Sequence, residues 1–272
     1  MRLGAFGPAV LATAAATLFA ADSGRKEAPL VYVGGVVNAA SFTPAPENFV
    51  CPNAIVSIFG LDLALRTRGV APGDLSGGKL PRNLGGVRVL IGNIEMPLFF
   101  VSPTQINAQI PSNIRPREAG WKIQVLREGL ASEARYDVRV RQVAPGLFPV
   151  VSHEDGSLVG RGEIEGSTPA APGEAVILFG AGFGETFPPA ASGLLVPFAA
   201  PVTAQARVLL EGRPVPPDHV LYVGQAPGFA GLYQVNVVIP ADTAAGDWEV
   251  IAELDDVASQ PGLLIAVEPS PL

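Results

Sequence analysis

The feature that most constrains the fold is a long internal repeat. Five short segments recur in the same order, and the two copies of each lie 119 to 129 residues apart. The matched pairs are 55–60 with 175–180, 87–91 with 206–210, 105–111 with 234–240, 119–121 with 245–248, and 131–132 with 258–259. A repeat of this length suits a complete domain and is much too long for a solenoid unit. The sequence therefore predicts two related domains.

Each copy has the pattern of a β-sandwich. Its apolar runs are short and rich in Val, Ile and Leu, and turn residues separate them, as at residues 76–78 and 155–156. Alternation is visible in the run 87–91, where Arg88 is the polar member between apolar neighbours. We predict an all-β fold with two tandem immunoglobulin-like β-sandwich domains, residues 31–143 and 148–267, after an N-terminal signal peptide. The short connection near Ala144 is expected to hold the domains close together.

The N-terminus, residues 1–21, has the layout of a secretory signal peptide. Arg2 precedes an uncharged stretch that ends in small residues, and the next charges follow at once. We expect cleavage near Ala20 or Ala21 and a secreted, periplasmic or cell-envelope location. The alternative is an uncleaved anchor, although Pro8 and the many Ala, Thr and Gly residues make the stretch weakly hydrophobic for a span. No later run is long and apolar enough to cross a membrane.

The charge of the chain excludes one class of partner. Formal net charge is −7, with 18 Lys and Arg against 25 Asp and Glu, and the basic residues form no cluster. A protein that binds nucleic acid needs a basic surface to displace the counterions of the phosphates. We therefore expect no nucleic-acid partner, and anionic membrane surfaces are disfavoured for the same reason.

Cys51 is the only cysteine. A single cysteine cannot form an internal disulfide, so the domains must be stabilised by packing of their cores. We expect a buried thiol near the start of a strand. A bridge between two molecules is the alternative.

Several motifs resemble those of a known family. They are Val-Asn-Ala-Ala-Ser-Phe at 37–42, Leu-Gly-Gly-Val at 84–87, Val-Ser-Pro-Thr-Gln-Ile-Asn at 101–107, Ala-Pro-Gly-Leu-Phe at 144–148, and Ala-Pro-Gly-Phe-Ala-Gly-Leu-Tyr-Gln-Val-Asn at 226–236. In this order they resemble a C-terminal domain family of uncharacterised secreted acidobacterial proteins, whose domains are similar to the IPT/TIG branch of immunoglobulin-like folds. The resemblance implies an extracytoplasmic setting and no particular reaction. Such regions often end much longer proteins, whereas we expect this pair to stand almost alone behind its signal peptide and not to serve as an appendage of a catalytic domain.

Paired amides recur at the same place in both copies. Gln105 and Asn107 match Gln234 and Asn236, and residues two apart on a strand project from the same face. One interpretation is a polar ligand site, for example for a sugar. The other is that these amides satisfy polar groups within the fold, and their presence in both copies favours it. Trp121 and the matching Trp248 are expected to pack on the cores rather than to stack on sugars.

Candidate chemistry is sparse. His153, beside Glu154 and Asp155, is the best base for a hydrolase, but no Gly-x-Ser-x-Gly motif accompanies it. The nearest acidic pairs are Asp255 with Asp256 and Glu163 with Glu165, and nothing places either pair across a cleft. The glycines at 180, 182 and 184 precede loop residues rather than a helix, which favours a tight turn or bulge over a phosphate site. We predict no catalytic residue, no metal and no cofactor.

The most consistent hypothesis is a non-enzymatic binding or structural module. Its partner would be a protein or a polysaccharide outside the cytoplasm, and the alternatives are a secreted hydrolase and a pure spacer. Binding is expected where the copies differ, at residues 187–201 and 224–230. The candidate residues there are Phe187, Phe198, Gln225 and Phe229.

Overall fold

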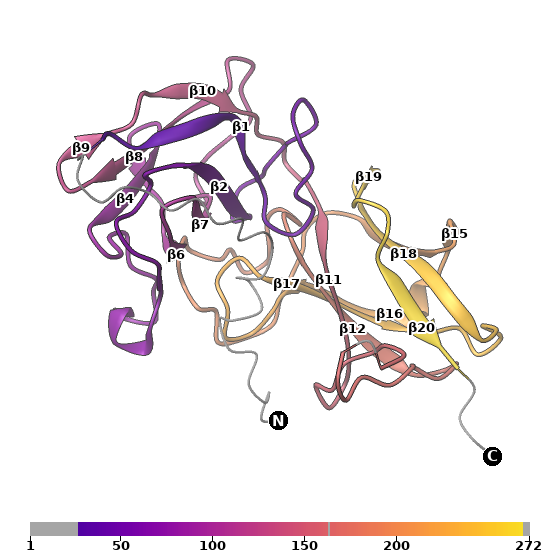
Figure 1. The fold of residues 1–272 in the computed structure, drawn as a ribbon. Helices are drawn as coiled ribbons and strands as arrows, with labels where there is room; N and C mark the ends of the chain where they lie inside the picture. Colours follow the sequence, from indigo (N-terminus) through magenta and orange to yellow (C-terminus); the bar gives the residue numbers. More distant parts are fainter. Residues whose placement is uncertain (1–26, 163, 269–272) are drawn as a thin grey trace.

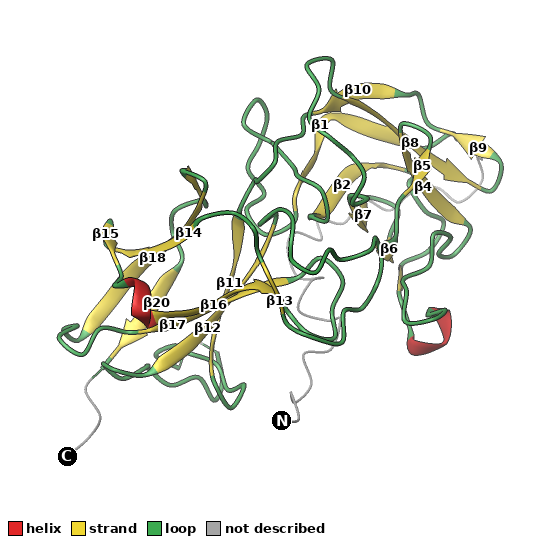
Figure 2. Cartoon of the chain, turned by 180° about the vertical axis from the view of Figure 1, so that it is seen from behind, coloured by secondary structure: helices red, strands yellow, loops and turns green. Residues whose placement is uncertain are grey.

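The computed structural model describes residues 27–162 and 164–268, and the expected signal peptide lies outside them. The chain is built from β-strands, with short 3-10 turns at η2 (Pro72–Asp74) and η3 (Pro217–His219) (Figure 2). The strands of the first half are β1 (Leu30–Asn38), β2 (Ile55–Leu61), β3 (Arg68–Gly69), β4 (Val87–Ile91), β5 (Ile94–Glu95), β6 (Leu98–Val101), β7 (Gln105–Gln109), β8 (Trp121–Arg127), β9 (Leu130–Ala131) and β10 (Arg135–Val138). Those of the second half are β11 (Gly146–His153), β12 (Ala175–Ala181), β13 (Ala200–Pro201), β14 (Ala206–Leu210), β15 (Arg213–Pro214), β16 (Val220–Gln225), β17 (Tyr233–Val238), β18 (Gly246–Leu254), β19 (Val257–Ala258) and β20 (Leu264–Val267).

Each half is a sandwich of two antiparallel sheets. In the first half the sheet orders are β1-β2-β7-β6-β3 and β10-β8-β4-β5. In the second half one sheet has the order β11-β12-β17-β16-β13, and in the other β18 pairs with β14 and β20. These orders match the A-B-E-D and G-F-C sheets of a constant-type immunoglobulin domain. The predicted fold class is therefore confirmed, while the division of the chain near residue 144 stays a prediction.

The cores follow from strand alternation. In β4, Val87, Val89 and Ile91 are buried while Arg88 is exposed, as the sequence pattern predicts. One cluster of buried apolar residues fills the first half and a separate cluster fills the second. Trp121 and Trp248 each pack against their own core, and each indole N–H donates to a backbone carbonyl, of Arg115 and Ala244 respectively. Both tryptophans therefore have the predicted packing role.

A buried asparagine joins the two halves at the linker, which we define as residues 142–145. The side-chain amide of Asn38, 2% exposed, donates from Nδ2 to the carbonyl oxygens of Ala144 at 2.8 Å and Ala181 at 3.1 Å. Its Oδ1 accepts from the backbone N–H of Ala40 at 2.8 Å. Figure 1 shows the halves meeting at this level, where β11 begins. Because the amide is buried and both of its ends are satisfied, this contact favours one arrangement of the halves.

Two glycines that follow β12, Gly182 and Gly184, lie against the linker. A Cβ on Gly182 would lie 2.1 Å from the Ala144 carbonyl oxygen, and one on Gly184 would lie 2.9 Å from Val143. Both glycines have positive φ, +84° and +90°, so the expected tight turn is present. The turn has a second role, because only glycine lets the linker backbone approach so closely. The Gly182 carbonyl accepts the Ala144 N–H at 2.8 Å.

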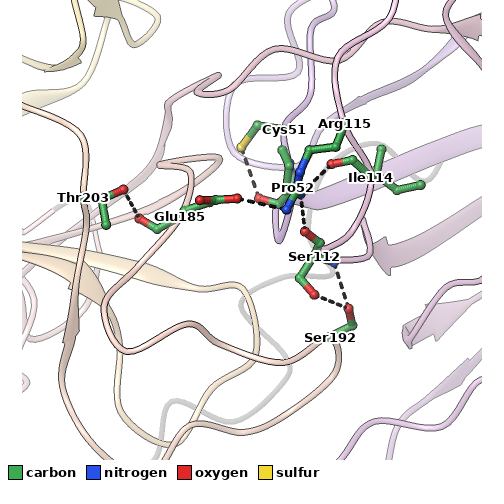
Figure 3. A network of polar contacts seen from close by, with 8 residues as sticks. All are labelled: Cys51, Pro52, Ser112, Ile114, Arg115, Glu185, Ser192 and Thr203. Atoms are coloured by element: carbon green, nitrogen blue, oxygen red, sulfur yellow. Dashed lines mark hydrogen bonds and ion pairs between the residues drawn. The ribbon is translucent and has the colours of Figure 1, made fainter.

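Cys51 is buried at the same junction. The side chain is fully covered, and its thiol lies against the Pro52 carbonyl oxygen at 3.4 Å (Figure 3). Burial raises the pKa of the Cys51 thiol to about 12. The expectation of a buried cysteine is therefore confirmed, and a thiol in this position is protonated and inaccessible to a second molecule.

We predict that Gly182→Ala destabilises the chain more than Gly212→Ala. Both glycines have positive φ, but a Cβ on Gly212 would meet nothing within 4 Å. Gly212→Ala should lower the free energy of unfolding by the conformational cost alone, about 1–2 kcal/mol. Gly182→Ala should lose a further ~1–3 kcal/mol, because the methyl group would overlap the linker. Urea unfolding measures both values, and equal losses would contradict the close approach of the linker.

Candidate functional site

Three loops from the two halves are hydrogen-bonded side by side. We call residues 78–80, 193–196 and 228–229 the three-loop bridge. Its backbone bonds run from Leu80 N to Gly193 O (2.9 Å), Leu195 N to Gly78 O (2.8 Å), Gly228 N to Val196 O (2.6 Å) and Val196 N to Phe229 O (3.3 Å). The bridge joins both copy-specific loops of the second half to the first half. These two loops, predicted separately as binding surfaces, are therefore brought together.

The three-loop bridge forms one wall of an apolar pocket, which we call the junction pocket. Its volume is about 210 Å³. Leu195 and Phe229 line it from the second half. Val70 and Leu75 line it from either side of η2, and Ile55 and Phe99 contribute from the first-half sheet. Ile55 belongs to a small buried cluster on which Phe99 also packs. The pocket is therefore an apolar recess shared by both halves, a common location for ligand sites.

The four candidate residues of these loops have different positions. Phe229 lines the junction pocket and is half-buried. Gln225 is 1% exposed, and its Nε2 donates to the Phe229 carbonyl at 3.0 Å, so its side chain supports the loop that carries Phe229. Phe187 and Phe198 are 73% and 47% exposed and lie outside the lining of the pocket. A binding role for these two phenylalanines stays a prediction.

Polar residues that the sequence analysis missed hold the bridge in place. Gln109, 1% exposed, accepts from the Gly193 N–H at 2.5 Å and donates from Nε2 to the Asn53 carbonyl at 3.2 Å. The Ser192 hydroxyl accepts from the Ser112 N–H at 2.8 Å (Figure 3). A signal for Gln109 exists in the sequence, because the matching residue of the second copy is Val238. A buried amide where the other copy is apolar marks a contact that only one copy makes.

The Arg115–Glu185 pair also spans the halves, as Figure 3 shows. Its nitrogen and oxygen lie 3.3 Å apart, and both side chains are more than half exposed. Exposed ion pairs contribute about 0–1 kcal/mol, so this pair adds little to the junction. The Arg115 guanidinium also donates to the Ser112 carbonyl at 2.6 Å.

The repeated amides form matching ladders within their sheets. Gln105 donates to the Asn107 Oδ1 at 2.8 Å, and Gln234 donates to the Asn236 Oδ1 at 3.1 Å. The pairing register is also the same, with Asn107 opposite Ser57 and Asn236 opposite Ile177. The Ser57 hydroxyl donates to the Asn107 Oδ1 at 3.1 Å. These contacts give the amides a structural role within each sandwich, and the ligand interpretation gains no support from them.

His153 is held by a carboxylate and a backbone carbonyl. Its Nδ1 contacts the Glu174 carboxylate, and its Nε2 lies 3.1 Å from the Thr168 carbonyl oxygen. Burial lowers the pKa of His153, but the hydrogen bonds to Glu174 and Thr168 outweigh it, and the pKa is raised overall. An imidazolium donates from both nitrogens and suits these two acceptors.

The Thr168 hydroxyl also lies 3.2 Å from the His153 Nε2, which superficially resembles a nucleophile beside a base. A general base needs a free lone pair at Nε2, and the raised pKa and the carbonyl contact both favour a proton there. His153 therefore links β11 to residues 168–174 and is poorly suited to accept a proton.

The acidic pairs show no catalytic arrangement. Asp255 accepts from the Gln205 N–H at 2.8 Å, and Asp256 pairs with Arg207 at 2.7 Å. Both aspartates have positive φ and occupy the turn after β18. Glu163 lies outside the described residues, and Glu165 is exposed. Within residues 27–162 and 164–268, no group of three or more His, Cys, Asp and Glu side chains is placed to hold a metal ion.

No known family model and no curated protein sequence matches the chain. It is weakly similar to SGBP-B of the Bacteroides ovatus mixed-linkage glucan utilization locus, solved in complex with a mixed-linkage heptasaccharide. That alignment has 11% identity and a TM-score of 0.30 over 82% of this chain and 45% of the other. The alignment with an auxiliary nutrient binding protein of Bacteroides ovatus has 12% identity and a TM-score of 0.25. It covers 84% of this chain and 44% of the other.

The N-terminal eight immunoglobulin domains of Down syndrome cell adhesion molecule give 15% identity and a TM-score of 0.22, over 67% of this chain and 20% of the other. The chain thus spans less than half the length of these solved proteins. The strand order of the two sandwiches establishes the immunoglobulin-like fold. In the described part of the chain, no helix has the length and apolar character needed to cross a membrane.

The contacts of His153 with Glu174 and Thr168, which we call the His153 clamp, predict a pH-dependent contribution to stability. Its folded pKa lies above the ordinary value of 6.5, so the clamp contributes fully below that value. The contribution disappears as the pH rises through the folded pKa. His153→Gln should therefore be less stable than the parent near pH 5, and the difference should shrink towards about pH 9. Urea unfolding across this range measures it.

Glu174→Gln provides the matched test, because it removes the carboxylate and keeps the side-chain shape. In the Glu174→Gln background, the difference in stability between His153 and His153→Gln should depend less on pH. A stability gap for His153→Gln that stays constant from low to high pH would contradict the clamp.

Proposed function

We propose that this chain is a non-enzymatic binding module that acts outside the cytoplasm and receives an apolar side chain of a partner protein in the junction pocket. The observation that carries the proposal is the composition of that pocket. Both copy-specific loops of the second half meet the first half there, and the recess that they enclose is apolar. The amide pairs that both copies share make contacts within each sandwich. The recess, by contrast, is lined by Leu195 and Phe229 from the loops in which the second copy differs from the first.

The chemistry of the walls favours a protein partner over a polysaccharide. Leu75, Leu195 and Phe229 present hydrocarbon to the cavity. A sugar hydroxyl placed there would lose its hydrogen bonds to water without replacement. Burying a Leu, Met or Phe side chain instead contributes about 1.5–3 kcal/mol. A few such anchors commonly supply most of the binding energy of a protein interface.

The pocket is also held in shape before any partner arrives. Gln225 supports the Phe229 loop from inside, and Gln109 holds the Gly193 segment of the three-loop bridge. Walls that are already ordered lose little conformational entropy on binding, which favours affinity. The junction between the halves therefore serves recognition as well as connection.

The extracytoplasmic setting is part of the proposal. It is supported by the signal-peptide pattern of residues 1–21 and by the resemblance to secreted IPT/TIG-like domains. Packing without a disulfide is compatible with such a setting, because each sandwich has its own apolar core.

Filling the pocket tests the proposal. Ala71 lines the recess and is exposed, so Ala71→Trp should occupy the cavity without disturbing the core. Peptides selected on the parent chain from a displayed random library should share an apolar anchor residue. Their affinity should fall at least about tenfold on Ala71→Trp, equivalent to about 1.4 kcal/mol. Ala131→Trp places the same side chain on exposed β9, away from the pocket, and should leave the affinity unchanged.

Two results would overturn this assignment. Selected peptides that bind Ala71→Trp as well as the parent would place the binding surface elsewhere. A neutral glycan whose binding is abolished by Ala71→Trp would show that the pocket receives sugar instead of protein.

A further inference from the structure

A second cavity opens where the linker meets the second half. We call it the linker pocket. It has a volume of about 280 Å³ and shares no lining residue with the junction pocket. Its walls come from three separate segments, residues 41–49 of the first half, 141–145 around the linker, and 257–261 after β18. Pockets at the meeting of domains are common ligand sites, and this volume lies near the lower end of their range, which suits a small ligand.

The chemistry of the linker pocket differs from that of the junction pocket. The polar side chains that line it are Ser41, Thr43, Glu47, Arg141, Ser259 and Gln260. The Thr43 hydroxyl donates to the Ser41 Oγ at 2.9 Å, so these two hydroxyls are already ordered. The cavity therefore offers donors and acceptors at several points of its wall.

Arg141 is oriented before any ligand binds. Its guanidinium carbon lies 3.3 Å from the centroid of the Phe49 ring, which is a cation–π contact. The backbone is held as well, because the Arg141 N–H donates to the Val50 carbonyl at 2.9 Å. Stacking covers one face of the planar guanidinium and leaves its N–H edge available to donate.

Glu47 supplies the opposite charge in the same pocket. Among the described residues, neither the Glu47 carboxylate nor the Arg141 guanidinium makes an ion pair, with each other or with a third side chain. The pocket thus combines a strong acceptor and a strong donor that remain available to a ligand.

The wall from the second half is fixed to the start of β11. The Gln260 side chain accepts from the Leu147 N–H at 3.1 Å and donates to the Leu147 carbonyl at 2.5 Å. Because one side-chain amide bonds to both the N–H and the carbonyl of the same residue, it holds the 257–261 segment beside β11. All three walls are therefore positioned by contacts within the chain.

We propose that the linker pocket binds one neutral sugar unit of an oligosaccharide. Each sugar hydroxyl both donates and accepts, so it matches a pocket with Arg141 and Glu47 on its walls. An anionic ligand would meet Glu47 and the net charge of −7, and a cationic ligand would meet Arg141. An apolar ligand would remove water from both charged groups without replacing its hydrogen bonds.

The test is isothermal titration calorimetry of the full chain with cellotetraose, xylotetraose and laminaritetraose. At least one should bind, and Arg141→Ala should weaken that binding by at least about tenfold. Arg139→Ala is the matched control, because Arg139 contacts the same Phe49 ring, at 4.0 Å, and lies outside the pocket. It should change the affinity by less than about twofold.

Glu47→Ala gives an independent readout with the same expected loss, should Arg141→Ala fail to fold. Ala131→Trp, on β9 and outside the linker pocket, should leave sugar binding unchanged. The proposal is overturned if none of the three tetrasaccharides binds, or if Arg139→Ala and Arg141→Ala weaken binding equally. Tighter binding of a galacturonic acid tetramer would also overturn it, because the neutral character of the ligand would then be wrong.

Discussion

The buried amide of Asn38 donates to carbonyl oxygens of the linker and of β12, and the arrangement of the two halves depends on this contact. A buried amide with partners on both sides penalises any other arrangement, because separation of the halves would leave it unsatisfied. The linker then lies against Gly182 and Gly184, whose missing side chains admit its backbone. With the halves placed in this way, the three-loop bridge forms and encloses the junction pocket.

The two pockets show how a duplicated sandwich acquires different sites. Each sandwich keeps the same strand order and the same amide ladder, so the sheets themselves offer little distinction between the copies. The junction pocket is apolar and depends on the loops around Phe229, whereas the linker pocket is polar and depends on Arg141 and Glu47. Joining two similar domains at an asymmetric contact thus creates surfaces that neither domain has alone.

The sequence predicts the sandwiches well, because a strand's alternation is local and the repeat doubles the signal. Val87 and Val89 are buried where alternation places them. The site is less predictable, since it depends on approaches between distant segments. The sequence shows that the loop of Phe229 differs between the copies. It does not show that this loop is hydrogen-bonded to Val196 in the three-loop bridge. Likewise, nothing in the sequence around His153 indicates Glu174, twenty-one residues away, as its partner.

The close approach at Gly182 also limits how such domains can be joined into longer arrays. In the repeat, position 182 of the second half corresponds to Asp62 of the first, and position 184 corresponds to Ala64. Each of these residues carries a Cβ where the second half has only a hydrogen atom, so the first half has no equivalent surface for an incoming linker. A third sandwich attached to the first half therefore cannot copy this junction. The packing of the linker against two glycines therefore gives the junction a direction, because the second half can receive a linker in this way and the first half cannot.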